Sequence, residues 1–214
     1  MAGDTADTKQ RLLIAAGELF AEHGIEGASL REITRRAGAN VAAVSYHFGS
    51  KEKLYTAVLR YVIEVEGAGR PSLFLPKLKA RSTQQDCSNV LHRIISARFA
   101  RYFSPDLPLW CSRLMMRSLL DPSPSLKEVV KQVLRPDHVA LVEIIRRSNR
   151  RLTRKQAQLS AFSLVGQIAF YVFARPAVLM LLDRKQYDPV FVQDAARHVS
   201  SIMARSLGLP EPKG

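Results

Sequence analysis

The chain has 214 residues, of which 47% are hydrophobic and 24% are charged. This composition is typical of a folded protein and argues against disorder. The 32 Lys and Arg residues outnumber the 19 Asp and Glu residues, giving a net charge of +13, which favours an anionic partner: nucleic acid, a membrane surface or an acidic ligand. Two cysteines, Cys87 and Cys111, are too few for a disulfide framework. The first residues show no secretory signal, so we expect a cytoplasmic protein with reduced thiols.

The positive charge is unevenly distributed along the chain. Residues 1–66 hold 8 basic and 9 acidic residues, whereas residues 67–214 hold 24 and 10. Six basic residues crowd into ten positions at an expected inter-helix turn: Arg146, Arg147, Arg150, Arg151, Arg154 and Lys155. Such a run is usually a solvated loop, although a contact with an acidic partner also fits it. The basic excess therefore does not locate a nucleic-acid site.

Residues 1–66 predict a small helical domain. The first helix buries a stripe of apolar residues and ends at Gly24, in the position that follows a helix C-terminus. A short second helix carries Glu32 three residues after its cap, the spacing of a capping box. The expected caps of the four helices are, in order, Asp7 or Thr8, Ser29, Asn40 and Ser50. The expected inward residues are Leu12, Leu13, Ala16, Leu19, Phe20, Leu30, Ile33, Ala37, Val41, Val44, Phe48, Leu54, Val58, Leu59 and Val62.

The remaining residues also show helical periodicity. Residues 67–83 hold two Gly and two Pro and predict a linker or loop. Residues 84–214 then predict a second domain with helices at about 84–103, 107–121, 124–149, 154–182 and 189–207. Pro136 and Pro176 fall inside two of these helices and should kink them. With no strand alternation and no internal repeat, the fold class is all-α.

Residues 29–48 have the organisation of a helix-turn-helix motif, in which two short helices flank the turn Gly38-Ala39-Asn40. The major groove of B-DNA, about 12 Å wide, admits one α-helix. Small residues on the outer face of the second helix would let its backbone approach base edges, and Tyr46 and His47 would donate to phosphates or bases. A helical hairpin with a glycine turn is also common without any DNA, so spacing alone leaves both interpretations open.

The sequence RLLIAAGELFAEHGIEGASLREITRRAGANVAAVSYHFGSKEKLY, residues 11–55, resembles the N-terminal domain of the tetracycline-repressor (TetR) family of bacterial transcription regulators. The resemblance covers about a quarter of the chain. It implies that Ser29, Leu30 and Arg31 meet the DNA backbone and that Lys51 contacts a phosphate. The positions that match the recognition helix are Asn40, Val41, Ala42, Ala43, Ser45, Tyr46 and His47. Many members carry an aromatic residue at the position of Ser45, so the operator sequence is not predicted.

In the same family, the C-terminal helices bind a ligand and form a homodimer, and the pattern after residue 84 resembles the CecR-like branch. Residues 156–174 contain no charged residue. A transmembrane span is disfavoured because Gln and Ser interrupt this run and Arg175-Pro176 follows it. A helix that is apolar on most sides is better explained by burial against its own domain and against a partner subunit. We therefore expect residues 154–182 and 189–207 to form the dimer interface.

Aromatic and Met residues on the middle helices suit a cavity for an apolar ligand, although each one also fits ordinary core packing. Arg113 and Arg117, four residues apart, would bind an acidic or polar end of that ligand. The predicted effector pocket comprises Phe99, Phe103, Trp110, Arg113, Met116, Arg117, Phe162 and Phe170.

Motifs of common hydrolases, metalloproteases and nucleotide-binding proteins are absent from the sequence, and the five His and two Cys residues show no metal-ligand spacing. We expect no enzyme activity, no cofactor and no metal. The predicted function is a dimeric repressor that binds a near-palindromic double-stranded operator and is released by a small-molecule effector. The alternatives are an all-α carrier or enzyme that reuses the fold, and a basic membrane-surface protein. The latter would need a basic amphipathic helix in the N-terminal half, which the sequence does not contain.

Overall fold

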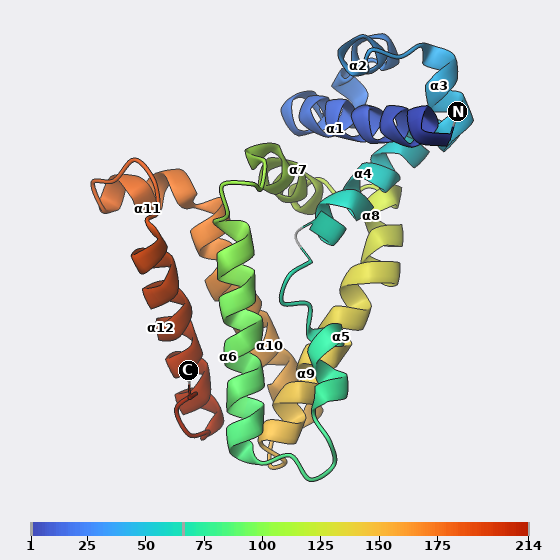
Figure 1. Ribbon diagram of the computed structural model, residues 1–214. Helices are drawn as coiled ribbons and strands as arrows, with labels where there is room; N and C mark the ends of the chain where they lie inside the picture. Colours follow the sequence, from blue (N-terminus) through green and yellow to red (C-terminus); the bar gives the residue numbers. More distant parts are fainter. Residues whose placement is uncertain (1, 66, 214) are drawn as a thin grey trace. The chain divides into compact units, whose positions relative to one another are not determined.

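The computed structural model describes residues 2–65 and 67–213, and within them every regular element is a helix, as the sequence predicts (Figure 1). The helices are α1 (Ala2–Gly27), α2 (Leu30–Ala37), α3 (Val41–Phe48), α4 (Lys51–Val65), α5 (Pro71–Phe74), α6 (Gln84–Tyr102), α7 (Leu109–Leu120), α8 (Pro124–Val129), α9 (Arg135–Ser148), α10 (Arg154–Phe173), α11 (Arg175–Leu181) and α12 (Pro189–Leu207). A 3-10 turn, Leu75–Lys77, follows α5, and a π-helical turn, Val130–Leu134, joins α8 to α9.

The chain folds into two compact units. The first comprises Met1–Val65 and Pro108–Val133, and the second comprises Glu66–Leu107 and Leu134–Gly214. The chain therefore passes from one unit to the other three times. Helix α7 and helix α8, which the sequence analysis groups with the C-terminal helices, belong to the first unit because they pack on α1 and α4.

The core of the first unit forms where α1 packs against α2, α4 and α7. Phe20 is fully buried, and its ring meets the Tyr55 ring edge-on at 5.1 Å between centroids. The Tyr55 hydroxyl forms a hydrogen bond of 2.8 Å with the Ser118 hydroxyl of α7. Gly17 allows α7 to approach closely, because a Cβ atom at this position would lie 2.3 Å from the Trp110 ring.

The predicted helix signals were only partly correct. Asn40 Oδ1 accepts from the Ala43 amide at 2.9 Å, and Ser50 Oγ accepts from the Lys53 amide at 3.2 Å, so both caps are confirmed. Gly24 has φ +73° and interrupts the helical geometry of α1. The expected caps Asp7 and Thr8 are wrong, because α1 already begins at Ala2.

The expected capping box of α2 is only half present. Ser29 Oγ accepts from the Glu32 amide at 3.1 Å, but the Glu32 carboxylate pairs with Arg35 and Arg36 instead of reaching back. The two arginines of the same helix therefore compete successfully for that carboxylate.

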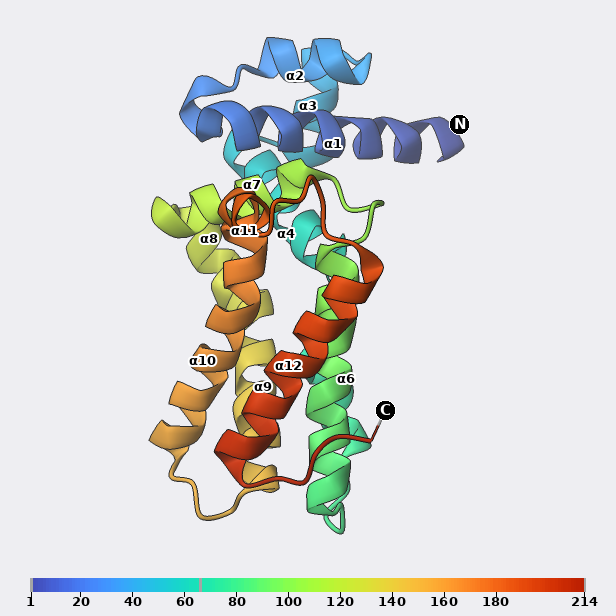
Figure 2. The same ribbon diagram turned by 90° about the vertical axis from the view of Figure 1, so that its left-hand side faces the viewer.

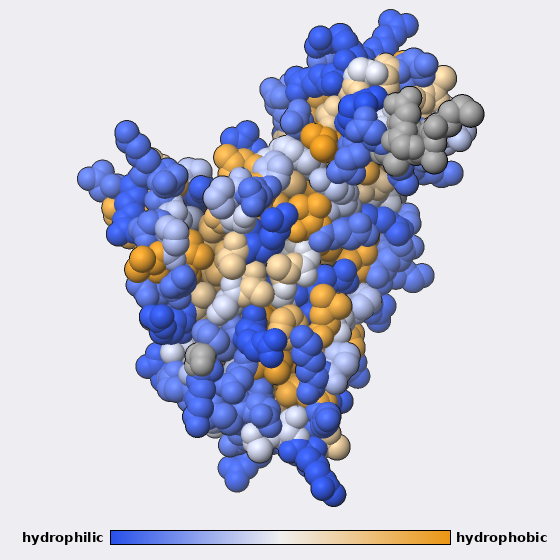
Figure 3. All heavy atoms as spheres, in the orientation of Figure 1, coloured by the Kyte–Doolittle hydropathy of each residue, from blue (hydrophilic) through white to orange (hydrophobic). Residues whose placement is uncertain are grey.

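The second unit is built around α6, α9, α10 and α12, which run alongside one another (Figure 2). Its core includes Phe99 of α6, Ile145 of α9, Leu164 of α10 and Val199 of α12. On the face shown in Figure 3, apolar surface gathers over α5, where Leu73 is 60% exposed. Residues 67–83, expected as a linker or loop, contain α5 and the 3-10 turn and pack on α6 and α9.

Two long predicted helices are interrupted in the structure. The segment 124–149 divides into α8, the π-helical turn and α9, and Pro136 stands in the first turn of α9, where its missing N–H is tolerated. The segment 154–182 divides at Ala174 into α10 and α11, with a bend of 74° and Pro176 in the first turn of α11. The kink expected at Pro176 is therefore confirmed, whereas Pro136 follows a π-helical turn and its expected kink stays a prediction.

No single helix in the described part of the chain is long and apolar enough to cross a membrane; only the bent pair of α10 and α11 reaches that length and hydropathy together.

Candidate nucleic-acid interface

Helices α2 and α3 are held in a helix-turn-helix arrangement by backbone and side-chain hydrogen bonds. Gly38 adopts the left-handed conformation, φ +60°, and its amide donates to the carbonyls of Thr34 and Arg35. The Ala39 amide also donates to the Thr34 carbonyl, at 2.9 Å. Asn40 then caps α3, so the turn contains only the residues needed to reverse direction. This geometry fixes the angle at which α3 leaves α2.

The predicted DNA-binding residues lie on the surface of the first unit. Tyr46 is 80% exposed, and its ring meets the His47 ring edge-on at 4.9 Å. Exposed side chains belong to Ser29, Arg31, Asn40, Val41, Ala42, Ser45 and Tyr46, and half-buried ones to Leu30, Ala43, His47 and Lys51. The structure therefore leaves all eleven accessible, and their contacts with DNA stay a prediction.

The expected inward face of α3 needs a correction. Val44 is 1% exposed and anchors the helix to the core, but Val41 is 43% exposed and Phe48 is only half-buried. Helix α3 has eight residues, and Val44, near its middle, is the one that is buried. The first turn, with Val41 and Ala42, stands free and presents apolar and small side chains outward.

Positive charge concentrates on this motif although the first 66 residues are nearly neutral overall. Residues 29–53 carry five basic residues and two acidic ones. Arg35 is paired with Glu32, and this hydrogen bond lowers the pKa of the Glu32 carboxyl. The Arg31 guanidinium makes no ion pair or hydrogen bond within the described residues, so its charge is available to an anion.

The first turn of α4 carries two lysines suited to binding a phosphate of the DNA backbone. Lys51 Nζ donates to the Glu26 carbonyl at 3.4 Å, which holds the ammonium group beside the end of α1. Lys53, which the sequence analysis did not include, is exposed on the same turn, and its side chain lies against Gly49. The sequence offered one signal for Lys53: it is a second lysine, two positions after Lys51, the expected phosphate-binding residue.

Two family descriptions match the chain. "Bacterial regulatory proteins, tetR family" matches residues 12–58, and "HTH-type transcriptional dual regulator CecR, C-terminal domain" matches residues 88–209, more than half of the chain. The chain belongs to the TetR family. Its C-terminal part is of the CecR type.

Individual relatives agree with this assignment. The transcriptional dual regulator CecR of Shigella flexneri is 31% identical over 140 residues, which cover 64% of this chain and 62% of the relative. The transcriptional repressor AcnR of Corynebacterium efficiens is 43% identical over 54 residues, 25% of this chain and 29% of the relative. The chain thus matches less than two thirds of the length of either TetR-family relative.

Solved structures share the fold over nearly the whole chain. The TetR-family regulator PfmR from Thermus thermophilus aligns with a TM-score of 0.64 and 17% identity, covering 91% of this chain and 94% of that one. AibR, solved with isovaleryl coenzyme A and operator DNA, aligns with a TM-score of 0.65 and 13% identity, covering 91% and 97%. CecR, AcnR and PfmR are all described as transcriptional regulators or repressors.

Four of the eight predicted effector residues lie on α7, in the first unit. Trp110 packs on Gly17 and stacks on the Tyr61 ring at 6.3 Å. Arg117 Nη2 donates to the Glu22 carbonyl at 3.1 Å, near the break in α1. Arg113 and Met116 are exposed. These contacts stabilise the packing of α7 on α1.

The other four lie in the second unit and do not form one cluster. Phe99 and Phe103 join an aromatic group with Tyr171 and Tyr187. Phe162 is 55% exposed and stacks on His138, and Phe170 is 58% exposed. A common pocket for all eight residues therefore stays a prediction. The structure also shows two hollows that the sequence did not indicate, on either side of Glu143 in α9.

Both cysteines are buried, Cys87 at 1% and Cys111 at 0% exposure. Burial raises the pKa of the Cys87 thiol, which keeps it protonated and unreactive. Within the described residues, no three His, Cys, Asp or Glu side chains lie close enough together to hold a metal ion.

Proposed function

We propose that this TetR-family regulator is a repressor that binds a near-palindromic operator as a homodimer and is released from it by a small-molecule effector. The observation that carries the proposal is the exposed outer face of α3 beside a rigid Gly38 turn. Its small residues, Ala42 and Ser45, permit close approach to base edges, while Tyr46 reaches outward. Lys51 and Lys53 at the start of α4 would bind the flanking phosphates.

The dimer is supported by an apolar face of α10. Leu159, Phe162, Val165 and Phe170 are each more than half exposed. Four large apolar side chains on one helix form a surface that a monomer would leave in water. A dimer formed through this face would carry two α3 helices, and two such helices in successive major grooves, about 34–36 Å apart, require a near-palindromic site.

We assign helix α12 a smaller part in that interface than the sequence suggested. Within residues 189–207, which were expected at the interface, Ala195, Val199 and Met203 are buried in the core of their own unit. Its exposed face carries Asp194 and Arg197, which pair with each other at 2.9 Å. We therefore assign the apolar centre of the interface to α10 and the polar rim to α12.

The effector is a mainly apolar molecule with one acidic end. Residues 67–214 carry the basic excess of the chain, and apolar side chains line their helices. Effector binding would release DNA by favouring the conformation in which the two α3 helices are wrongly spaced, and a tenfold affinity difference between the two forms supplies about 1.4 kcal/mol.

The proposal is tested by selection of DNA from a randomised duplex pool with the full chain, followed by titration of the selected duplex. We expect one enriched sequence with two inverted half-sites whose centres are one helical turn apart, or slightly more. Binding should involve two copies of the chain per duplex. Enrichment of no sequence, or of an asymmetric site bound by one copy, would contradict the proposal.

A further inference from the structure

A hollow of about 450 Å³ lies between α9, α10 and the 3-10 turn that follows α5. This volume is within the range of small-molecule sites. Leu75, Val139 and Val142 supply apolar walls, and the lining is mostly apolar. We call this hollow the α9–α10 groove. None of the residues that line it was among the predicted effector residues.

Three arginines surround the α9–α10 groove: Arg135, Arg146 and Arg154. The only carboxylate in its lining, Glu143, is held by Arg147 at 2.9 Å and lies 3.9 Å from Arg146. Within the described residues, the side chains of Arg135 and Arg154 make no hydrogen bond or ion pair. Two cationic groups at the edge of an apolar hollow therefore lack an anionic partner, and an anion would be attracted to them.

One side of the α9–α10 groove is lined by His138. The His138 ring stacks on Phe162 at 4.7 Å with an interplanar angle of 21°. Burial lowers the pKa of His138, so its ring stays neutral at pH 7. Its Nε2 atom is buried and has no hydrogen-bond partner among the described residues. This side of the groove therefore suits an alkyl or aryl body rather than a second charge.

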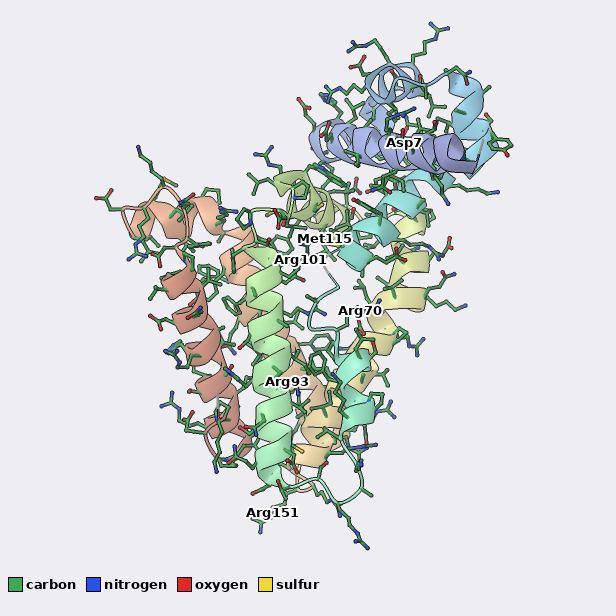
Figure 4. The ribbon with its side chains drawn as sticks, viewed as in Figure 1. Asp7, Arg70, Arg93, Arg101, Met115 and Arg151 are labelled. Carbon is green, nitrogen blue, oxygen red and sulfur yellow. The ribbon has the colours of Figure 1, made fainter. Side chains whose placement is uncertain are left out.

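The groove adjoins the segment that continues the chain from α4. Leu75 in its lining follows Arg70, which is labelled in Figure 4, and Ser72, and both are hydrogen-bonded to Asp137 of α9. Asp137 is 6% exposed and accepts from Arg70 Nε at 2.8 Å, from the Ser72 amide at 3.3 Å and from the Ser72 hydroxyl. Asp137 is next to His138 and two residues before Val139. The groove and this tether thus share one turn of α9.

A second tether fixes the same segment to α6. Gly69 adopts φ +73°, and a Cβ atom there would lie 2.5 Å from the Ile94 carbonyl. Arg98 Nε donates to the Gly69 carbonyl at 3.4 Å. Residues 69–75 are thus held at defined points on α6 and α9. A change in α9 would be transmitted to the chain that leads back to α4.

We propose that the α9–α10 groove binds a small amphipathic anion, whose alkyl body lies on Val139, Val142 and Leu75 and whose carboxylate or phosphate lies between the arginines. Occupancy is relayed to the helix-turn-helix through residues 69–75. The relay rests on the proposed function, whereas the binding site stands on the groove itself. The class of ligand is set by the combination of apolar walls and unpaired guanidinium groups.

Binding is tested by calorimetry on the full chain with octanoate and octyl phosphate, and with octanol and octylamine for comparison. We expect both anions to bind more tightly than octanol, and octylamine to bind least. Arg135→Gln and Arg154→Gln should each weaken the binding of octanoate by about tenfold, the effect of one charge-assisted hydrogen bond, without weakening the binding of octanol. Val139→Trp should block the groove and abolish binding. Val139 is 50% exposed, so the folded core tolerates this change.

The matched control is Arg151→Gln. Arg151 belongs to the same basic run, is exposed at the turn between α9 and α10 (Figure 4) and does not line the groove. The Arg151→Gln variant should bind octanoate as tightly as the unmodified chain does. Equal losses of octanoate affinity in Arg154→Gln and Arg151→Gln would show that octanoate is attracted by net charge alone, and would overturn the site. Absence of anion binding by the unmodified chain, with a shifted dimer equilibrium in Val139→Trp, would identify the groove as a subunit contact and also overturn it.

The relay is tested with the duplex selected as described above. Octanoate should weaken duplex binding by the unmodified chain but not by Val139→Trp, whose duplex affinity without octanoate should be normal. Ser72→Ala removes one hydrogen bond to Asp137 and leaves the ion pair between Asp137 and Arg70. The variant should therefore bind octanoate normally, but octanoate should weaken its duplex binding less than that of the unmodified chain. If Ser72→Ala retains the full effect, the relay through this segment is wrong. If the chain selects no duplex at all, the proposed function fails while the binding results still decide the site.

Discussion

At the scale of single residues, the surface around α3 differs from the basic patch that the net charge would suggest. The positive charge of the chain lies mostly after residue 66, whereas the helix-turn-helix relies on a few well-placed groups. Small side chains such as Ala42 and Ser45 determine how closely a duplex could approach. Cations such as Arg31, Lys51 and Lys53 would then fix its register through phosphates.

Lys51→Ala should weaken binding to the selected duplex and reduce its dependence on salt. If Lys51 neutralises one phosphate per subunit, its loss lowers the slope of log affinity against log salt by about 1 for each subunit. Titrations at several salt concentrations measure this slope. The variant keeps the fold because Lys51 is only half-buried and its one hydrogen bond is long. An unchanged slope would contradict the placement of Lys51 at the duplex.

His138→Phe should make the protein less sensitive to mild acid. Burial lowers the pKa of His138 below its ordinary value of 6.5, so between these two values the unfolded chain binds a proton that the folded chain does not. The stability from this group is therefore present above about pH 6.5 and is lost as the pH falls through the folded pKa. Denaturation at pH 7 and pH 5 should show a smaller loss in the variant. Burial also lowers the pKa of His92, so part of the slope remains.

At the scale of helices, close packing of α1 on α7 depends on a missing side chain. Gly17→Ala would place a Cβ atom 2.3 Å from the Trp110 ring, so the ring or the helix must move. Overpacking of this kind costs about 1–3 kcal/mol, which exceeds the gain of up to about 1 kcal/mol from replacing a helical glycine. We expect a lower melting temperature by circular dichroism. Restoration by a second change, Trp110→Leu, would confirm the cause, and an unchanged melting temperature in Gly17→Ala would contradict it.

The sequence predicts the helices well because their caps and apolar spacing are local. Asn40 and Ser50 cap the helices they were expected to cap. Spacing does not determine which surface a helix packs against. Helix α7 has an amphipathic pattern that suits either unit, and only Gly17, far away in the sequence, provides the flat surface for Trp110. For this reason, Trp110 and Arg117 looked like pocket residues.

The candidate DNA site was predictable from the sequence and the α9–α10 groove was not. The helix-turn-helix lies within about 25 consecutive residues, so its spacing is visible in the sequence. The groove brings together Leu75, Val139 and Gln158 from three separate segments. Two of its three arginines, Arg146 and Arg154, belong to a run whose ordinary interpretation is a solvated loop. Val41 was misplaced because α3 is too short for its spacing to distinguish a covered turn from an exposed one.

At the scale of the whole molecule, the chain crosses between the two units three times. A conformational change in one unit can therefore reach the other along the chain. Dimerisation would couple two such chains. In the proposed repressor dimer both α3 helices would have to fit one duplex, so a modest change of spacing would lower affinity at both half-sites at once.

Leu159→Glu should weaken the dimer without unfolding the chain. Leu159 is 56% exposed on α10, so a carboxylate is tolerated in the monomer but would be buried unpaired in the proposed interface. Sedimentation should show a dimer dissociation constant at least about tenfold higher. Leu73→Glu is the matched control, because Leu73 is 60% exposed on α5, away from α10 in sequence and outside the proposed interface. Equal dimerisation in both variants would mean that α10 is not the interface.

The central claim, that the outer face of α3 contacts DNA, is tested most directly by comparing Ala42→Glu with Ala100→Glu. Both alanines are exposed on helices, the first in the first turn of α3 and the second on α6. A carboxylate in the first turn of α3 favours the helix, so lost binding would not reflect a lost fold.

The measurement is the affinity of each variant for the selected duplex. A carboxylate against base edges and phosphates in two half-sites should weaken binding by about a hundredfold or more in Ala42→Glu. Ala100→Glu should bind as the unmodified chain does. Equal affinities of the two variants, with both chains folded and dimeric, would contradict the account.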